Sequence, residues 1–462
     1  MKVTRGYKTE LRPNVKQAIL LYQFAGAARF AYNYGLARKK EVSAESGKRI
    51  SSIDLMKELT ARKHTDLPWL KNVSKWVYQN ALRDLDEGMN HFFRRVRERK
   101  SGKKNHQKLG FPVFKKKSQG IGSFRLDSPI SVQEDRLQLP KLGTIRLKER
   151  SYIPTSGVKV LSATLSEEAG RWYVAVLVEE EVPEMVPASG PPIGVDLGIA
   201  TLATVSDGRK IDNPKALSTN LKRLKRAQRH LSRCHKGSAN RGKAKAKVSR
   251  LHARIAHIRA DALHQATSSL VHAPLSASER SHLKTRLTAD LPEAKTKPEQ
   301  KKVKKQVKAR LHQTTEQNAP KRPQVICLED LNVEGMKQNR KLARAISDVG
   351  MGEFRRQMTY KSLWNGEHLI FADRFFPSSK QCHCCGWKWE EMTLSDRLFV
   401  CQNPACPLSL VKQDRDGNAS QNLENEAKKE LAQSTGSYSG LKMPVDGRST
   451  TWGGTFPGNS TG

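Results

Sequence analysis

The spacing of apolar residues changes several times along the first half of the chain. Residues 1–11 alternate between polar and apolar positions, which predicts a strand. Apolar residues then recur every three or four positions over 13–34 and again over 52–99, which predicts long helices. Short alternating runs broken by Gly and Pro follow over 110–181 and predict several strands. We therefore expect a small β-barrel that includes the first strand, with a helical segment inserted into it.

The second half of the chain has the pattern of an α/β domain. Residues 193–207 predict a strand, a tight turn and a second strand, and the apolar run 325–328 predicts a buried strand. Residues 217–271 predict two helices that form an antiparallel hairpin, and 354–364 predict another helix. The hairpin is rich in Lys and Arg, which favours a nucleic-acid contact over a merely solvated helical pair.

Three segments lack such periodicity. Residues 182–192 are rich in Pro and Glu and predict a linker. Residues 273–322 are polar, contain a Lys run, and predict an inserted basic arm or a partly ordered loop. The Gly/Ser/Thr-rich end, 433–462, predicts a disordered tail.

The charge of the chain restricts its partners. The 462 residues include 83 Lys and Arg against 45 Asp and Glu, a formal net charge of +38. So large an excess disfavours compaction unless a polyanion screens it, and phosphate backbones are the obvious partner. The alternatives are a merely soluble basic protein or one that binds anionic membranes. No apolar run reaches the roughly 18–20 residues of a membrane helix, and the start has no signal-peptide pattern, so we expect no membrane partner.

Three stretches far apart in the chain each carry one acid at a position where a carboxylate could bind a metal ion. Asp196 and Glu329 each follow an apolar run, as if each lay at the mouth of a buried strand, and Asp416 lies in a turn-rich stretch before a helical pattern. Three converging carboxylates repel one another unless cations neutralise them, which predicts two Mg²⁺ ions. Such a pair hydrolyses phosphodiesters. Any one acid alone would more simply be a helix cap or a surface charge, and Asp414 competes with Asp416 for the third position.

Five of the seven cysteines lie in one short stretch. Cys382, Cys385, Cys401 and Cys406 form two knuckles, a pattern typical of one structural Zn²⁺. Cys384 is an alternative ligand to Cys382, the second knuckle is wider than usual, and His383 reads as an exposed knuckle residue rather than a ligand. The isolated Cys234 and Cys327 do not suggest a disulfide framework, so we expect a reduced, cytoplasmic compartment.

With these features in this order, the chain closely resembles TnpB, a family of transposon-encoded, RNA-guided nucleases. The resemblance rests on Gly-Val-Asp196-Leu-Gly-Ile, on residues 346–354 (Ile-Ser-Asp-Val-Gly-Met-Gly-Glu-Phe), on Phe-Pro-Ser-Ser-Lys380 and on Asp-Arg-Asp416-Gly-Asn-Ala. It implies the following domains: a wedge β-barrel (1–11 and 110–185), a helical recognition domain (12–109), a RuvC-like nuclease domain of RNase H fold (186–377 and 411–432) and a zinc-binding target nucleic-acid module (378–410). The insertion 273–322 is longer than the family's usual connection, but it touches no catalytic acid.

The resemblance also implies an activity and its partners. Such a protein uses a transposon-derived guide RNA to cleave complementary double-stranded DNA beside a short motif, with Asp196, Glu329 and Asp416 as catalytic Mg²⁺ ligands, alongside a transposase. The helix that begins Lys75-Trp76-Val-Tyr-Gln79 matches the family's motif-reading helix, although Trp76 is equally suited to the core. The alternatives are a compact type V CRISPR effector, a guide-independent DNA nuclease or resolvase, and a non-cutting RNA-guided repressor, against which the three intact acids argue.

Overall fold

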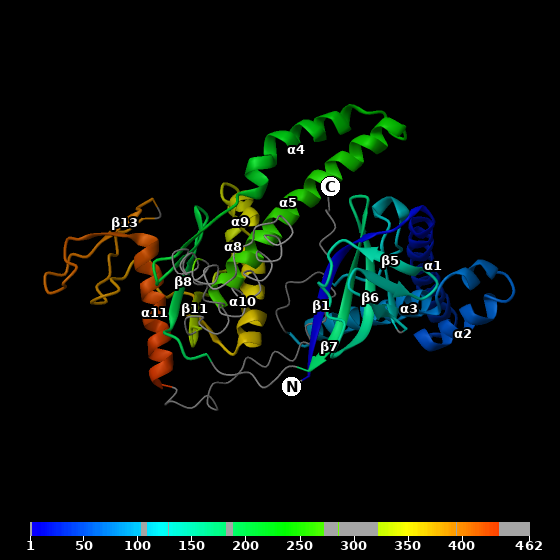
Figure 1. Cartoon of the computed structure of the whole chain (residues 1–462), viewed down its shortest axis with the longest axis horizontal. Coiled ribbons are helices and arrows are strands. Elements are labelled where there is room, and N and C mark those ends of the chain that lie inside the picture. The colour runs from blue at the N-terminus through cyan, green and yellow to red at the C-terminus, as the bar shows by residue number, and fades with distance from the viewer. Residues whose placement is uncertain are drawn as a thin grey trace, which may run out of the picture. The chain divides into compact units, whose positions relative to one another are not determined.

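The chain folds into two compact units, residues 1–183 and residues 184–448 (Figure 1). The computed structural model describes residues 2–102, 109–127, 129–181, 188–271, 285, 322–393 and 395–433. Most of the expected linker (182–192), nearly all of the expected arm (273–322) and the tail after residue 433 lie outside the described residues.

A seven-stranded antiparallel sheet forms one layer of the first unit. Its strands are β1 (Lys2–Arg12), β2 (Ser123–Asp127), β3 (Ser131–Val132), β4 (Arg136–Leu139), β5 (Gly143–Leu147), β6 (Val158–Glu168) and β7 (Arg171–Glu181). They follow the order β2-β6-β7-β1-β5-β4-β3, in which the first strand of the chain pairs with β7 along most of its length and with β5 at its end. Within the described segments no pairing joins β2 to β3, so closure into a barrel stays a prediction.

Helices α1 (Val15–Ser46), α2 (Ser52–Arg62) and α3 (Lys75–Lys100) form the second layer of this unit. The side chain of Asn14 starts α1 through a capping box with Gln17, one residue after the proline that the pattern marked. The long helix expected over 52–99 is wrong in one respect, because a 3₁₀ turn (Pro68–Asn72) separates α2 from α3. Pro68 disfavours the helical conformation at the residue before it, so α2 cannot continue through this point. A second 3₁₀ turn covers Lys117–Gln119.

The second unit is built on a five-stranded mixed sheet. Strands β8 (Ile193–Leu197), β9 (Thr201–Val205), β10 (Lys210–Asp212), β11 (Val325–Glu329) and β12 (His368–Ala372) follow the order β10-β9-β8-β11-β12. The β8–β9 hairpin and the buried strand β11 were predicted, and both are confirmed. Strand β10 was not predicted, because three residues with a single apolar side chain show no recognisable period. β8, β11 and β12 run parallel to one another.

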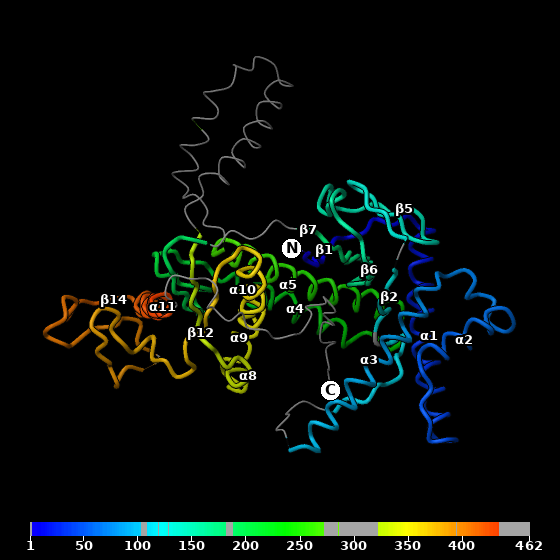
Figure 2. Tube along the Cα trace, turned by 90° about the horizontal axis from the view of Figure 1, so that it is seen from below, coloured from blue at the N-terminus to red at the C-terminus, as the bar shows by residue number. Residues whose placement is uncertain are grey.

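The helices of this unit are α4 (Ala216–Arg233), α5 (Ala239–Val271), α8 (Val333–Met336), α9 (Ala343–Val349), α10 (Met351–Asn365) and α11 (Arg415–Gln433). Helices α5 and α10 pack on one face of the sheet and α11 packs on the other, whereas α4 packs on α5. Figures 1 and 2 show α5 and α10 side by side, and α11 across the sheet from them. Alternate residues of β11 serve the two faces: Ile326 packs in the core with α5 and α10, and Cys327 packs in the core with α11. This two-sided burial explains why the strand reads as a continuous apolar run.

Strands β13 (Leu398–Val400) and β14 (Lys412–Asp414) form a small antiparallel sheet just before α11. Phe399 is fully buried there among cysteines and the rings of Trp387 and Trp389, so this module has its own small core. Among the described helices, none is long and apolar enough to cross a membrane.

Candidate functional site

Two of the predicted acids lie at the same end of two adjacent parallel strands. The register pairs Val195 of β8 with Leu328 of β11, so Asp196 and Glu329 are the next residues along each strand. Parallel strands present their carboxyl ends at one edge of a sheet, which is where ligands bind in open α/β sheets. Asp196 is only 8% exposed.

The third predicted acid reaches this edge on helix α11, and a glycine allows the close approach. A Cβ at Gly194 of β8 would lie 2.0 Å from the carbonyl oxygen of Ser420 and 2.3 Å from the nitrogen of Glu424, both backbone atoms of α11. The helix therefore packs directly on the strand that carries Asp196. Asp416 lies in the first turn of α11, not before it as the sequence suggested. Its Oδ1 accepts a hydrogen bond of 3.0 Å from Nη2 of Arg415.

The three acids interact electrostatically. Burial raises the pKa of Asp196 well above its usual value, and the charges of Glu329 and Asp416 raise it further, while Arg415 opposes them. Burial likewise raises the pKa of Glu329, against a hydrogen bond from Ser378. Among the described residues the three carboxylates do not form a group with all ligand atoms within 4.8 Å of one another. They form a partly buried cluster that gains from a cation, because a cation relieves both the burial cost and the repulsion.

The competing acid, Asp414, has a structural role of its own. Its Oδ2 accepts hydrogen bonds from the backbone nitrogen of Gly417 (3.2 Å) and from Nζ of Lys210 (2.9 Å), so it caps the start of α11. Its side chain is 48% exposed, against 23% for Asp416. The charge of Asp416 also raises the pKa of Asp196 more than the charge of Asp414 does. The geometry therefore favours Asp416 as the third member of the cluster.

Ser378 joins the cluster although sequence reasoning gave it no role. Its hydroxyl donates a hydrogen bond of 2.5 Å to Oε1 of Glu329, and its residue is 3% exposed. Asn422 of α11 donates to the backbone oxygen of Ser378 at 2.8 Å. The available signal was the Phe-Pro-Ser-Ser-Lys stretch, but nothing local in it points to an acid 49 positions away.

The four predicted cysteine ligands come together. The sulfur atoms of Cys382, Cys385, Cys401 and Cys406 lie within 4.8 Å of one another, although the second knuckle is wide. Cys384 is exposed and outside this group, so it does not replace Cys382. Cys327 lies apart in the sheet, where burial raises the pKa of its thiol to about 12. Four convergent thiols are the donor set of a closed tetrahedral zinc site.

His383 is not the exposed knuckle residue that the sequence suggested. Its backbone nitrogen and its Nδ1 contact Oδ1 of Asn418 at 3.1 and 3.0 Å, and its carbonyl oxygen accepts from Asn425 at 2.8 Å. Together with Asn422, these α11 amides bind the first knuckle to the helix that carries Asp416. The expectation failed because three Asn side chains on one helix face donate and accept hydrogen bonds, and their partners cannot be read from the sequence.

The three predicted motif-reading residues belong to the first unit, at the start of α3. Lys75 is exposed, with Nζ 5.2 Å from the centre of the Trp76 ring. Trp76 is partly buried against the core, which supports its alternative structural role, and Gln79 is partly exposed. Lys75 and Gln79 therefore stay candidates for reading bases.

Three protein-family models match parts of the chain. A family described as "Probable transposase" matches residues 173–274, a "Helix-turn-helix domain" matches 1–48, and a "Cas12f1-like, TNB domain" matches 352–423. Over the described part of 1–48 the structure has one strand and one long helix rather than two helices.

Two full-length relatives are similar across most of the chain. A protein of Escherichia coli strain K12, named "Putative RNA-guided DNA endonuclease InsQ", is 32% identical over 87% of this chain and 88% of its own length. A protein of Streptomyces pristinaespiralis, named "Putative RNA-guided DNA endonuclease", is 31% identical over 91% and 89%. The chain belongs to this family, the TnpB family, and the predicted resemblance is confirmed.

Solved structures with weak similarity include "Cryo-EM structure of the Cas12f1-sgRNA-target DNA complex" (13% identity, TM-score 0.29, 92% of this chain and 99% of that one). Another is "Structure of the mini-RNA-guided endonuclease CRISPR-Cas_phi3" (12% identity, TM-score 0.35, 92% of each chain).

Proposed function

We propose that this protein is an RNA-guided DNA endonuclease that uses a transposon-derived RNA to cleave complementary double-stranded DNA beside a short motif. Family membership supports the activity, since the two relatives carry names of that kind. The observation that carries the proposal is that Asp196, Glu329 and Asp416, which come from three distant segments, lie near enough at one edge of the sheet to interact electrostatically.

The strand arrangement supports an RNase H-like nuclease domain. An antiparallel β10-β9-β8 meander continues through parallel β11 and β12, and helices lie on both faces. Asp196 and Glu329, at the carboxyl ends of β8 and β11, would face the scissile phosphate at this edge. The same five strands therefore provide both the scaffold and two of the three proposed ligands.

The acids fit Mg²⁺, whose ligands are oxygens. When bound, a pair of such ions supplies a hydroxide nucleophile and stabilises the leaving oxygen. Asp196 and Glu329 would hold the ions from the sheet and Asp416 would hold them from α11. Ser378 orients the Glu329 carboxylate, and Arg415 balances charge beside Asp416. Cys382, Cys385, Cys401 and Cys406 would hold one structural Zn²⁺, which supplies folding free energy to the module beside α11.

The proposed nucleic-acid partners are the guide RNA and the target duplex. Base pairing would select the target, and exposed Lys75 with Gln79 would read the adjacent motif on the duplex. The formal net charge of +38 favours binding of both of these polyanions.

A pair of substitutions tests the catalytic site. Asp416→Asn should abolish cleavage by the purified RNA complex while leaving target binding intact, because it weakens metal binding and not base pairing. Asp414→Asn is the matched control, because Asn also caps helices. The substitution removes the ion pair with Lys210, but this pair is exposed, so cleavage should stay near wild type. Retained cutting by Asp416→Asn together with loss in Asp414→Asn would remove Asp416 from the site.

A further inference from the structure

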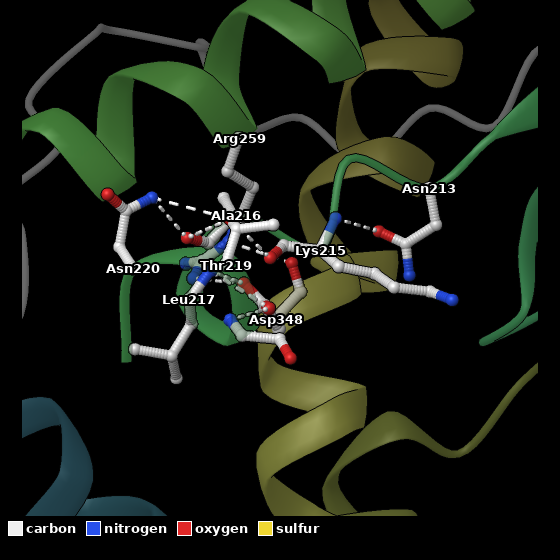
Figure 3. Close-up of polar contacts among 9 residues, drawn as sticks. Asn213, Lys215, Ala216, Leu217, Thr219, Asn220, Arg259 and Asp348 are labelled. Carbon is white, nitrogen blue, oxygen red and sulfur yellow. Dashed lines mark hydrogen bonds and ion pairs between the residues drawn. The ribbon is translucent and has the colours of Figure 1, made fainter. Parts of the chain in front are cut away.

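Residues 346–354 contain a buried acid that the proposed catalytic site does not use. Asp348 lies in α9 and is 6% exposed. Its Oδ1 and Oδ2 accept hydrogen bonds from the backbone nitrogen of Leu217 at 2.8 and 3.0 Å, and Oδ2 accepts from that of Ser218 at 3.1 Å (Figure 3). Each contact spans about 130 positions of sequence, so a distant carboxylate caps the start of α4.

Helix α4 needs such a cap because its own sequence supplies none. The residue at its N-cap, Lys215, has a left-handed backbone (φ +45°) and makes no side-chain capping bond. Its own nitrogen donates to Asn213, which holds the turn in place (Figure 3). The first turn contains no acid. Free N–H groups at a helix start carry partial positive charge, so a buried carboxylate there stabilises both the hydrogen bonding and the dipole.

The same carboxylate ties α4 to α5. Nη2 of Arg259 on α5 donates to Oδ1 of Asp348 at 3.2 Å, and its Nε donates to the Asp348 carbonyl oxygen at 2.9 Å. The turn between α9 and α10 packs tightly on α5 here, since a Cβ at Gly350 would lie 3.1 Å from Leu263 and 3.2 Å from Arg259. Asp348 and Arg259 thus fix the direction in which α4 leaves the sheet.

The helical pair that starts at this point is strongly basic. Helix α4 carries six Lys and Arg and no acid, and within the described ranges none of the six has a carboxylate partner; they are Lys222, Arg223, Lys225, Arg226, Arg229 and Arg233, all exposed. The first half of α5 adds exposed Lys243, Lys245, Lys247 and Arg250. An apolar seam that includes Leu224, Leu251 and Ile255 holds the two helices together. Such a surface fits a phosphate backbone.

We propose that Asp348 is a positioning residue that, with Arg259, holds the basic α4–α5 surface in the orientation in which it binds nucleic-acid phosphates. The inference rests on the proposed function for its partner. The inference predicts an unusual effect of charge. Removing the negative charge of Asp348 should weaken binding to a polyanion, whereas removing an ordinary surface acid strengthens such binding.

The test compares Asp348→Asn with Asp261→Asn in the full-length protein. Both remove one negative charge near the basic pair, but Asp261 is exposed on α5 and caps no helix. Binding to a duplex without a target sequence is measured without Mg²⁺ and without a chelator, over a range of salt. We expect Asp261→Asn to bind as tightly as wild type or tighter. We expect Asp348→Asn to bind at least about threefold more weakly, with a salt slope smaller by about one for each phosphate that the protein no longer neutralises.

Activity separates positioning from a general loss of fold. With the guide RNA bound, Asp348→Asn should need more target DNA for half-maximal cleavage, while its rate at saturating DNA stays near wild type. If Asp348→Asn unfolds, Arg259→Gln keeps the cap but removes the tie to α5 together with one positive charge. It is therefore compared with Arg254→Gln, which removes the same charge from an exposed position of α5, and it should bind more weakly than that variant. Binding and salt slopes of Asp348→Asn equal to those of Asp261→Asn, or of Arg259→Gln equal to those of Arg254→Gln, would overturn the inference. Failure of wild type to cut DNA would instead count against the proposed function, since the Mg²⁺-free binding assay requires no cleavage.

Discussion

Replacing Gly194 by alanine tests the packing that places the third acid. A Cβ at this position would lie 2.0 Å from the Ser420 oxygen, 2.3 Å from the Glu424 nitrogen and 2.8 Å from the Leu423 carbonyl carbon. All three are backbone atoms, so no rotamer change relieves the clash. Ordinary contact begins at 3.4 Å, so α11 must move by about 1.4 Å.

The expected cost has a structural part and a catalytic part. Overpacking of a well-packed core costs about 1–3 kcal/mol, which for a unit of this size lowers Tm by roughly 2–12 °C. The displaced helix carries Asp416, and a misplacement of about 1 Å costs on the order of 100-fold in rate. We expect Gly194→Ala to lose more activity than its stability loss explains when cleavage is measured at 25 °C, where most molecules stay folded.

The assay is thermal unfolding together with single-turnover cleavage of a matched target. Gly352→Ala is the control, because this glycine also lies in the second unit, in the first turn of α10, and no atom lies within 4 Å of its would-be Cβ. The control should match or slightly exceed wild-type stability. Wild-type Tm and wild-type cleavage in Gly194→Ala would refute the close approach of α11 to β8.

Three further changes probe other parts of the second unit. Burial raises the pKa of Glu367 to about 8, so in this pH range the folded state keeps a proton that the unfolded state has released. The free energy of unfolding should therefore fall as pH rises from about 4.5 to 8, and Glu367→Gln should flatten this dependence and add ~2–4 kcal/mol at pH 8 in urea unfolding. An unchanged pH profile in Glu367→Gln would contradict the raised pKa. Ser378→Ala removes the hydrogen bond that orients Glu329 and should raise the Mg²⁺ concentration for half-maximal cleavage by roughly 10–100-fold; an unaltered metal titration would show that the contact is dispensable. Cys401→Ser should abolish bound zinc, measured per chain, while Cys384→Ser retains it, and the reverse pattern would exchange their roles.

The sequence was informative where burial and chemistry leave a local signature. The runs before Asp196 and Glu329 read as strands because both faces of β8 and β11 are buried, and acids that end such runs stand out. The cysteine spacing likewise predicted which four sulfurs would meet.

The contacts that fix the site geometry leave no such signature. Gly194 looks like any strand glycine until α11 is placed on it, and Asp348 looks like an ordinary surface acid of a short helix until α4 is placed above it. Ser378 meets Glu329 only through the fold. These are pairings between distant segments, and neither helical nor strand periodicity records which distant backbone atom a side chain will meet.

The central claim is that base pairing with a bound RNA directs the proposed active site to its target. The most direct measurement gives the purified protein two RNAs that differ only in the guide segment, together with a mixture of the two matching DNA targets beside the same short motif. The account predicts Mg²⁺-dependent cutting only of the DNA that matches the RNA supplied, and none with Asp196→Asn. Cutting of both targets with either RNA, or cutting without RNA, would contradict it.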